Sequence, residues 1–237
     1  QQLAFAPGAE VWLTDDGSSL VDALCSELTG QQLIPRRIVI NQAHPVVPST
    51  LAGLLIVAPL TGTDDHFLSA AFDLLHKLAP ALLKGSESGG AFFATVSRLN
   101  GCFGLPARTR FNDPLSGGLA GLSKTAALEW PSVHCKALDL AMGMEVAPIA
   151  KVLVEEVFTA APLEIGITST GLQALELRTE ALAPAATEPL LDSGELVVVS
   201  GGARGVTAAV SVALAQQCRP TLVLLGRSPL PETEPDW

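Results

Sequence analysis

The chain has 237 residues, 48% of them hydrophobic and 16% charged, so it is a globular chain with enough residues for a sizeable core. Its formal net charge of −10 argues against a nucleic-acid partner, because phosphate binding requires clustered Lys and Arg. The longest apolar run, residues 51–60, is too short to span a bilayer, and no secretory signal opens the chain. The four scattered cysteines favour free thiols in a reducing cytoplasm over disulfides, and the four histidines lack metal-binding spacing.

Short apolar runs alternate with longer segments of helical periodicity. The strand-like runs lie at residues 11–14, 36–41, 51–60, 90–97, 133–140 and 171–179. The helical segments lie at residues 18–30, 64–85, 117–130 and 147–160. This order of near-continuous apolar strands and helices predicts a Rossmann-like α/β fold, a doubly wound parallel sheet covered on both faces.

Local signals predict where some helices begin and end. Ser18 or Ser19 is expected to be the N-cap of the first helix, and Gly30 its C-terminal stop. Pro80 falls inside the second predicted helix, where we expect a kink.

The chain contains an internal repeat. When Thr14 is set against Ser200, "VWLTDDGSSLVDALCSEL" aligns with "VVVSGGARGVTAAVSVAL", and each copy runs through a helix into another apolar strand. A Pro-, Ala-, Thr- and Glu-rich stretch separates the copies and has the composition of a linker. We therefore predict a Rossmann-like unit over residues 1–182, a linker over 183–195, and the first β-α-β of a second unit over 196–237.

The second copy has a glycine-rich turn, "SGGARGV", between a strand and a helix. We expect Gly201 to permit the tight turn, Gly202 to let the backbone approach a ligand, and Gly205 to let helix and strand pack. The helix N-terminus would then offer free N–H groups to a pyrophosphate. The alternative is a glycine-rich turn that binds nothing.

The strand after this helix ends in "LLGRS". Rossmann units that bind NAD carry an acid at this place, and a guanidinium there instead matches the 2′-phosphate of NADP. Arg227 therefore favours NADPH, although an exposed Arg at a strand end is the alternative. The predicted cofactor contacts are Gly201, Gly202, Ala203, Arg204, Gly205, Val206, Gly226, Arg227 and Ser228.

In the first copy the same turn reads "TDDGSS". Asp15 and Asp16 occupy the position where a phosphate would sit, and like charges repel. We predict that this copy binds no nucleotide. Both residues are expected to be solvated or helix-capping turn carboxylates and not an acid/base pair.

Two stretches carry a family resemblance: "GLAGLSKTAALEWP" at residues 118–131, and "VVVSGGARGVTA" followed by "LVLLGRS". They resemble the ketoreductase domains of type I polyketide and fatty acid synthases, which belong to the short-chain dehydrogenase/reductase class. The form "SGGARGVT" is most similar to the ketoreductase of polyunsaturated fatty acid synthases. The resemblance implies a structural subdomain that has lost cofactor and catalytic residues, followed by the start of the catalytic subdomain.

The resemblance also implies a reaction: reduction of a β-ketoacyl group on an acyl carrier protein by NADPH, with a Tyr as proton donor, a Lys beside it and a Ser that orients the carbonyl. Ser97 and Lys124 occupy reminiscent places, but Ala120 stands where the Tyr would be and the chain contains no Tyr. We therefore expect no catalytic residue in this chain and no turnover by it alone. Lys124 is expected to lie on the helix surface or to make a structural contact. No metal is expected.

The implied partners are acyl carrier protein domains and other synthase domains, and a homodimer is left open. Two alternatives remain from the residues: a non-catalytic scaffold or docking module within a synthase, and a free-standing NADP-binding regulatory domain. The second is weaker, since one β-α-β leaves strand edges unpaired. For the same reason residues 196–237 are not expected to be stable as an isolated unit.

Overall fold

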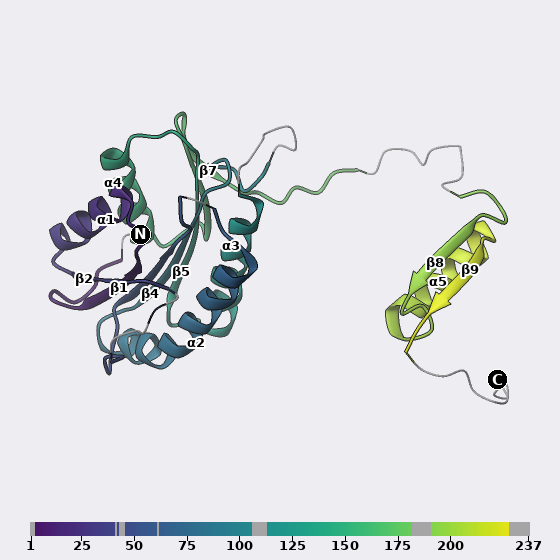
Figure 1. Cartoon of the computed structure of the whole chain (residues 1–237), viewed down its shortest axis with the longest axis horizontal. Coiled ribbons are helices and arrows are strands. Elements are labelled where there is room, and N and C mark those ends of the chain that lie inside the picture. Colours follow the sequence, from purple (N-terminus) through teal and green to yellow (C-terminus); the bar gives the residue numbers. More distant parts are fainter. Residues whose placement is uncertain are drawn as a thin grey trace. The chain divides into compact units, whose positions relative to one another are not determined.

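The computed structural model describes residues 3–40, 42, 46–60, 62–105, 113–181 and 191–227. The chain divides into two compact units, Gln1–Leu177 and Arg178–Trp237 (Figure 1), and each is described here by itself. Among the described residues, no helix is both long enough and apolar enough to cross a membrane.

The first unit is built on one seven-stranded sheet with the order β2-β1-β3-β4-β5-β6-β7. Its strands are β1 (Glu10–Thr14), β2 (Ile34–Ile38), β3 (Gly53–Val57), β4 (Phe92–Ser97), β5 (His134–Leu140), β6 (Glu164–Thr168) and β7 (Gly171–Ala174). All neighbours are parallel except β6 and β7. The predicted doubly wound α/β class is confirmed.

The end of this sheet differs from the prediction. The sequence analysis placed no strand at β6, whose "EIGIT" is too short and too interrupted by glycine to show an apolar run. The strand expected over residues 171–179 ends at Ala174 and is antiparallel, because β6 and β7 form a tight hairpin in which Thr168 is paired with Gly171. An antiparallel edge strand on a parallel sheet is common in this fold class.

Helices cover both faces of the sheet (Figure 1). They are α1 (Ser19–Gly30), α2 (Asp65–Ser88), α3 (Gly118–Glu129, preceded by the 3-10 turn Pro114–Gly117) and α4 (Val146–Val157). Side chains of α1 and α4 share one hydrophobic cluster with Val11 and Leu13 of β1, while those of α2 and α3 share another with Trp12. This alternation along β1 is the period of two that a strand buried on both faces must show.

The first helix ends at Gly30 as predicted, but Gly30 itself does not make the turn. The left-handed residue that follows the helix is Gln32 (φ 64°). The N–H of Leu33 then bonds to Leu28 O (3.1 Å) and that of Gln32 to Thr29 O (2.9 Å), a Schellman motif with Gln in the usual glycine position. The second helix runs through Pro80 to Ser88, so Pro80 lies inside it as predicted, and the kink expected there stays a prediction.

Two basic residues of β5 are shielded from solvent, one of them completely and one in part. Lys136 is completely buried, and its Nζ donates to Pro162 O at 2.6 Å and lies 3.6 Å from Glu156 Oε2. Burial lowers the pKa of Lys136, an effect that Glu156 opposes. Burial also lowers the pKa of His134, and the nearby charge of Lys136 lowers it further. The sequence analysis had read both residues only as members of an apolar strand.

His134 is expected to make the first unit sensitive to acid. Its folded pKa lies below the unfolded value of about 6.5, so the unfolded chain binds more protons as the pH falls through that value. Its contribution to stability is therefore full above that pH and is lost as the pH falls through the folded pKa. We expect the free energy of unfolding, measured in urea between pH 7 and pH 5, to fall with pH more steeply for the unchanged chain than for His134→Gln. The difference in slope should be up to about 1.4 kcal/mol per pH unit. His76→Gln, at an exposed histidine, is the matched control; equal slopes for all three proteins would contradict the prediction.

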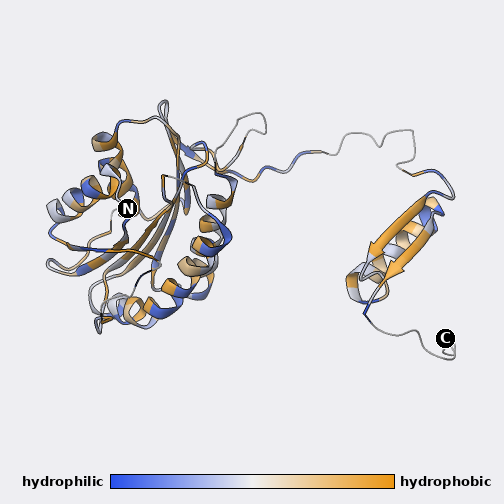
Figure 2. Cartoon of the chain, in the orientation of Figure 1, coloured by the Kyte–Doolittle hydropathy of each residue, from blue (hydrophilic) through white to orange (hydrophobic). Residues whose placement is uncertain are grey.

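The second unit consists of β8 (Leu196–Ser200), α5 (Gly205–Cys218) and β9 (Thr221–Leu225), with β8 and β9 parallel. Helix α5 packs on one face of the two strands (Figure 1). Leu196, Val198 and Val223 remain 66%, 59% and 40% exposed, and Figure 2 shows both strands coloured as hydrophobic. An apolar face of this kind needs a covering element, so the expectation that residues 196–237 are unstable alone stays a prediction.

Candidate functional site

The glycine turn and Arg227 lie at the same edge of the second unit. The turn follows β8, and the N–H of Gly201 donates to Leu225 O, the last residue of β9, at 2.6 Å. Because β8 and β9 are parallel and in register, Gly226 and Arg227 follow β9 at the edge where the turn begins. The fold thus brings the predicted phosphate turn and the predicted specificity residue together.

The glycines of the turn differ in what constrains them, and Gly201 permits the tight turn as predicted. Gly201 (φ 73°) and Gly205 (φ 55°) both adopt the left-handed conformation that favours glycine. A Cβ on Gly202 would lie 2.6 Å from Leu224 Cδ2 and 3.1 Å from Val199 Cγ1. Gly202 is therefore needed for packing within the unit, and the ligand approach expected at this residue stays a prediction. Gly205 is needed for its backbone conformation and not for packing, since nothing lies within 4 Å of a Cβ there.

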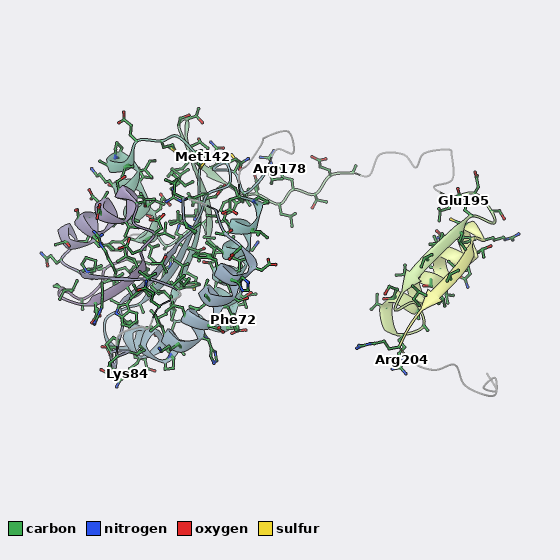
Figure 3. All side chains as sticks on the ribbon, in the orientation of Figure 1. Phe72, Lys84, Met142, Arg178, Glu195 and Arg204 are labelled. Atoms are coloured by element: carbon green, nitrogen blue, oxygen red, sulfur yellow. The ribbon has the colours of Figure 1, made fainter. Side chains whose placement is uncertain are left out.

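The N-terminus of α5 is open. Arg204 occupies the N-cap position in an extended conformation, and no side chain caps the helix. Ala203, Arg204, Val206, Gly226 and Arg227 are all exposed, and Figure 3 shows Arg204 at the opposite end of the unit from Glu195. Uncapped N–H groups beside two arginines form a positively polarised edge. The remaining predicted contact, Ser228, lies outside the described residues.

The corresponding turn of the first unit is closed by its own side chains. Of the two alternatives predicted for Asp16, the solvated one is wrong, because its side chain is only 7% exposed and lies 3.6 Å from Arg98 Nη2. Its two carboxylate oxygens accept from the N–H groups of Ser18 (2.9 Å) and Leu60 (3.0 Å). A phosphate would have to displace these bonds and face a carboxylate. Asp15 caps the turn as predicted, accepting from Gly17 N at 2.8 Å.

Ser97 and Lys124 have structural partners. The Ser97 hydroxyl donates to Asp139 Oδ1 at 2.8 Å, and both side chains are buried. Lys124 Nζ lies 3.1 Å from Glu164 Oε1, which confirms the structural contact expected for this lysine. Ala120 is buried in α3.

Asp139, at the end of β5, is a residue that the sequence analysis missed. Its carboxylate accepts from the backbone N–H groups of Leu99, Asn100 and Phe103 at 2.9, 3.3 and 2.8 Å. It thus fixes the loop that follows β4. A carboxylate within an otherwise apolar strand, "HCKALDL", was the available signal.

The described residues contain no group of His, Cys, Asp and Glu side chains that could hold a metal ion. All four cysteines are free thiols. Burial raises the pKa of Cys135 to about 12, so its thiol is protonated at neutral pH and a poor nucleophile.

Comparison with known proteins identifies the fold. No family model matches the chain. An A-type ketoreductase from a modular polyketide synthase aligns with 94% of the chain at a TM-score of 0.60 and 19% identity. A C2-type ketoreductase from a modular polyketide synthase aligns with 94% of it at a TM-score of 0.58 and 18% identity. The chain has the ketoreductase fold.

The ketoreductase resemblance read from the sequence is thereby confirmed, and a sequence relative supports it. One of the subunits of the polyunsaturated fatty acid synthase of Thraustochytrium sp. is 33% identical over 176 residues, which cover 69% of this chain. The chain spans only 6% of the length of that relative, and 50% and 52% of the A-type and C2-type ketoreductases.

Proposed function

We propose that this chain is part of an NADPH-dependent ketoreductase, which reduces β-ketoacyl thioesters carried on acyl carrier protein domains of a multidomain synthase. Residues 1–182 would form the structural subdomain, 183–195 a linker, and 196–237 the start of the cofactor-binding subdomain. The observation that carries the proposal is the glycine turn that opens α5 beside the end of β9, where Arg227 follows. The ketoreductase fold and the synthase relative support it.

The residues at this edge fit NADPH. The left-handed glycines shape the turn, the uncapped first turn of α5 would donate N–H groups to the pyrophosphate, and the open space beside Gly205 leaves room for it. Arg227 would pair with the 2′-phosphate. NADPH, when bound, supplies the hydride. This chain's residues would bind and orient it, and the proton donor must come from elsewhere, since the chain has no Tyr.

Arg227→Ala tests this assignment. We expect the unchanged chain to bind NADPH about tenfold or more tightly than NADH, because a hydrogen bond between charged groups contributes about 1.5–3 kcal/mol. Arg227→Ala should remove this preference and leave the NADH affinity unchanged, as measured by isothermal titration calorimetry. Arg36→Ala, which alters an exposed arginine of the first unit, is the control. A preference for NADPH that survives in Arg227→Ala would contradict the assignment.

The same titration separates the proposal from its main alternative, a non-catalytic scaffold or docking module. A scaffold needs neither left-handed glycines at a helix N-terminus nor a basic residue after the adjacent strand. Binding of neither nucleotide by the folded chain would favour the scaffold.

A further inference from the structure

The first unit has a pocket of about 250 Å³ that the proposed function does not use. It lies where residues following β1, β3, β4 and β5 meet the start of α4. In doubly wound sheets, ligands bind in the crevice outside the carboxyl ends of the strands, which is this location. Its apolar lining consists chiefly of Leu20, Leu140, Met142, Met144, Val146 and Ile149.

Two polar groups in the pocket lack hydrogen-bond partners. Ser18 and Arg98 both line it, and their Oγ and Nη2 atoms are buried with no hydrogen-bond partner among the described residues. Arg98 is only 8% exposed, and its Nε donates to Ala58 O at 2.7 Å. That bond leaves Nη2 3.6 Å from Asp16 Oδ2, too far for a hydrogen bond. Buried polar groups are nearly always paired, so two such groups in one pocket point to an acceptor supplied by a ligand.

The charges around these groups favour a neutral acceptor over an anion. Arg98 already lies beside the carboxylate of Asp16, so the two formal charges offset each other. An added anion would be repelled by Asp16 and would have to lose its hydration in a partly apolar pocket. A carbonyl oxygen accepts from an N–H or O–H donor without that desolvation cost.

The apolar part of the pocket suits a short, flexible molecule. Both of the chain's methionines, Met142 and Met144, line it. Figure 3 labels Met142, which marks the end of the first unit where the pocket lies. Methionine side chains are flexible and polarisable and adapt to varied apolar surfaces. The volume is below the roughly 300 Å³ at which pockets begin to hold drug-sized ligands, which favours a small molecule.

We propose that this pocket binds a small neutral molecule with a carbonyl acceptor and a short apolar chain, that is, an acyl amide, ester or thioester. Its carbonyl would accept from Arg98 Nη2 and Ser18 Oγ, and its chain would lie against the two methionines. The proposal is independent of the nucleotide assignment, because it concerns the other unit of the chain.

NMR of the whole chain labelled with [¹³C-methyl]methionine tests it, because both native methionine signals report on the pocket. The probes are octanamide, octanoate and acetamide, at a pH where octanoate is ionised. We expect octanamide to shift the signals of Met142 and Met144 saturably, octanoate to bind several-fold more weakly, and acetamide to cause no saturable shift. Tighter binding of octanoate would overturn the neutral-carbonyl assignment, and the absence of any saturable shift with octanamide would overturn the whole proposal.

Two variants locate the site. Ser18→Ala removes one proposed donor and should weaken octanamide about fivefold, since a hydrogen bond contributes about 1 kcal/mol. Met144→Trp fills the pocket and should abolish the shift of Met142. Leu128→Trp, at a residue of α3 that is 84% exposed and does not line the pocket, is the matched control. Circular dichroism establishes that each variant folds; undiminished binding by folded Met144→Trp would overturn the proposal.

Discussion

Gly85→Ala is expected to destabilise the first unit by about 3 kcal/mol or more, the upper range for overpacking a core. Gly85 is buried in α2, and a Cβ there would lie 2.0 Å from the carbonyl oxygen of Leu51. The backbone at Leu51 is held against the helix by a bond from its N–H to Ala81 O at 2.9 Å. The added methyl group fits only if α2 and the backbone at Leu51 move apart, which would break the hydrogen bond between Leu51 and Ala81. The substitution therefore lowers the free energy of unfolding.

Gly121→Ala is the matched control, because Gly121 is also a helical glycine, in α3, but is exposed with nothing within 4 Å of a Cβ. Alanine is more favourable than glycine inside a helix, so this variant should gain up to about 1 kcal/mol. Urea unfolding of both variants gives the two free energies. Equal effects of the two substitutions would show that the close approach at Leu51 does not constrain the helix.

Glu156→Gln is expected to cost about 3 kcal/mol, because it removes the charge partner of the fully buried Lys136. The ammonium group of Lys136 would keep its contact with Pro162 O but would carry an uncompensated charge in the protein interior. The pKa of Lys136, already lowered by burial, should fall further when Glu156 no longer opposes that effect. The loss of stability should therefore become smaller as the pH rises, which urea unfolding at neutral and alkaline pH measures.

Replacing both members of the pair gives the contrasting result. Lys136→Met combined with Glu156→Leu should leave the unfolding free energy unchanged or raise it, because buried ion pairs gain little over apolar packing of similar volume. Lys151→Met combined with Glu155→Leu alters an exposed pair on α4 and controls for the change in charge. A double variant at residues 136 and 156 that is as unstable as Glu156→Gln would contradict this account.

Much of the fold follows from local pattern. The buried strands β3 and β4 are near-continuous apolar runs, and α2 and α4 repeat apolar residues at helical spacing, so their type was predictable. The hairpin of β6 and β7 was not, because a five-residue strand with a central glycine carries no periodic signal. The end of α1 at Gly30 was predicted, but the left-handed Gln32 after it was missed, since a left-handed glutamine depends on two backbone bonds and not on its own preference.

Some features of the candidate site could also be predicted from the sequence, and others could not. The strand–turn–helix context of the glycines and the position of Arg227 after the next strand could be read from the sequence, since parallel strands end at one edge. The reasons for Gly202 and Gly205 could not, because they depend on contacts with Leu224 and on a backbone angle. The burial of Asp16 against Arg98 likewise depends on two strand ends, far apart in the sequence, that the fold brings together.

NADPH oxidation by the longer synthase protein that we propose contains this chain is the most direct test of the ketoreductase function. Supplied with a β-ketoacyl thioester, that protein should oxidise NADPH and form the β-hydroxyacyl product. Gly205→Val within it should abolish this turnover, because a β-branched residue is strained at a φ of 55°. Gly30→Val, at a helical glycine with open space, is the control. The absence of thioester-dependent oxidation, or turnover that Gly205→Val leaves intact, would contradict the proposed function.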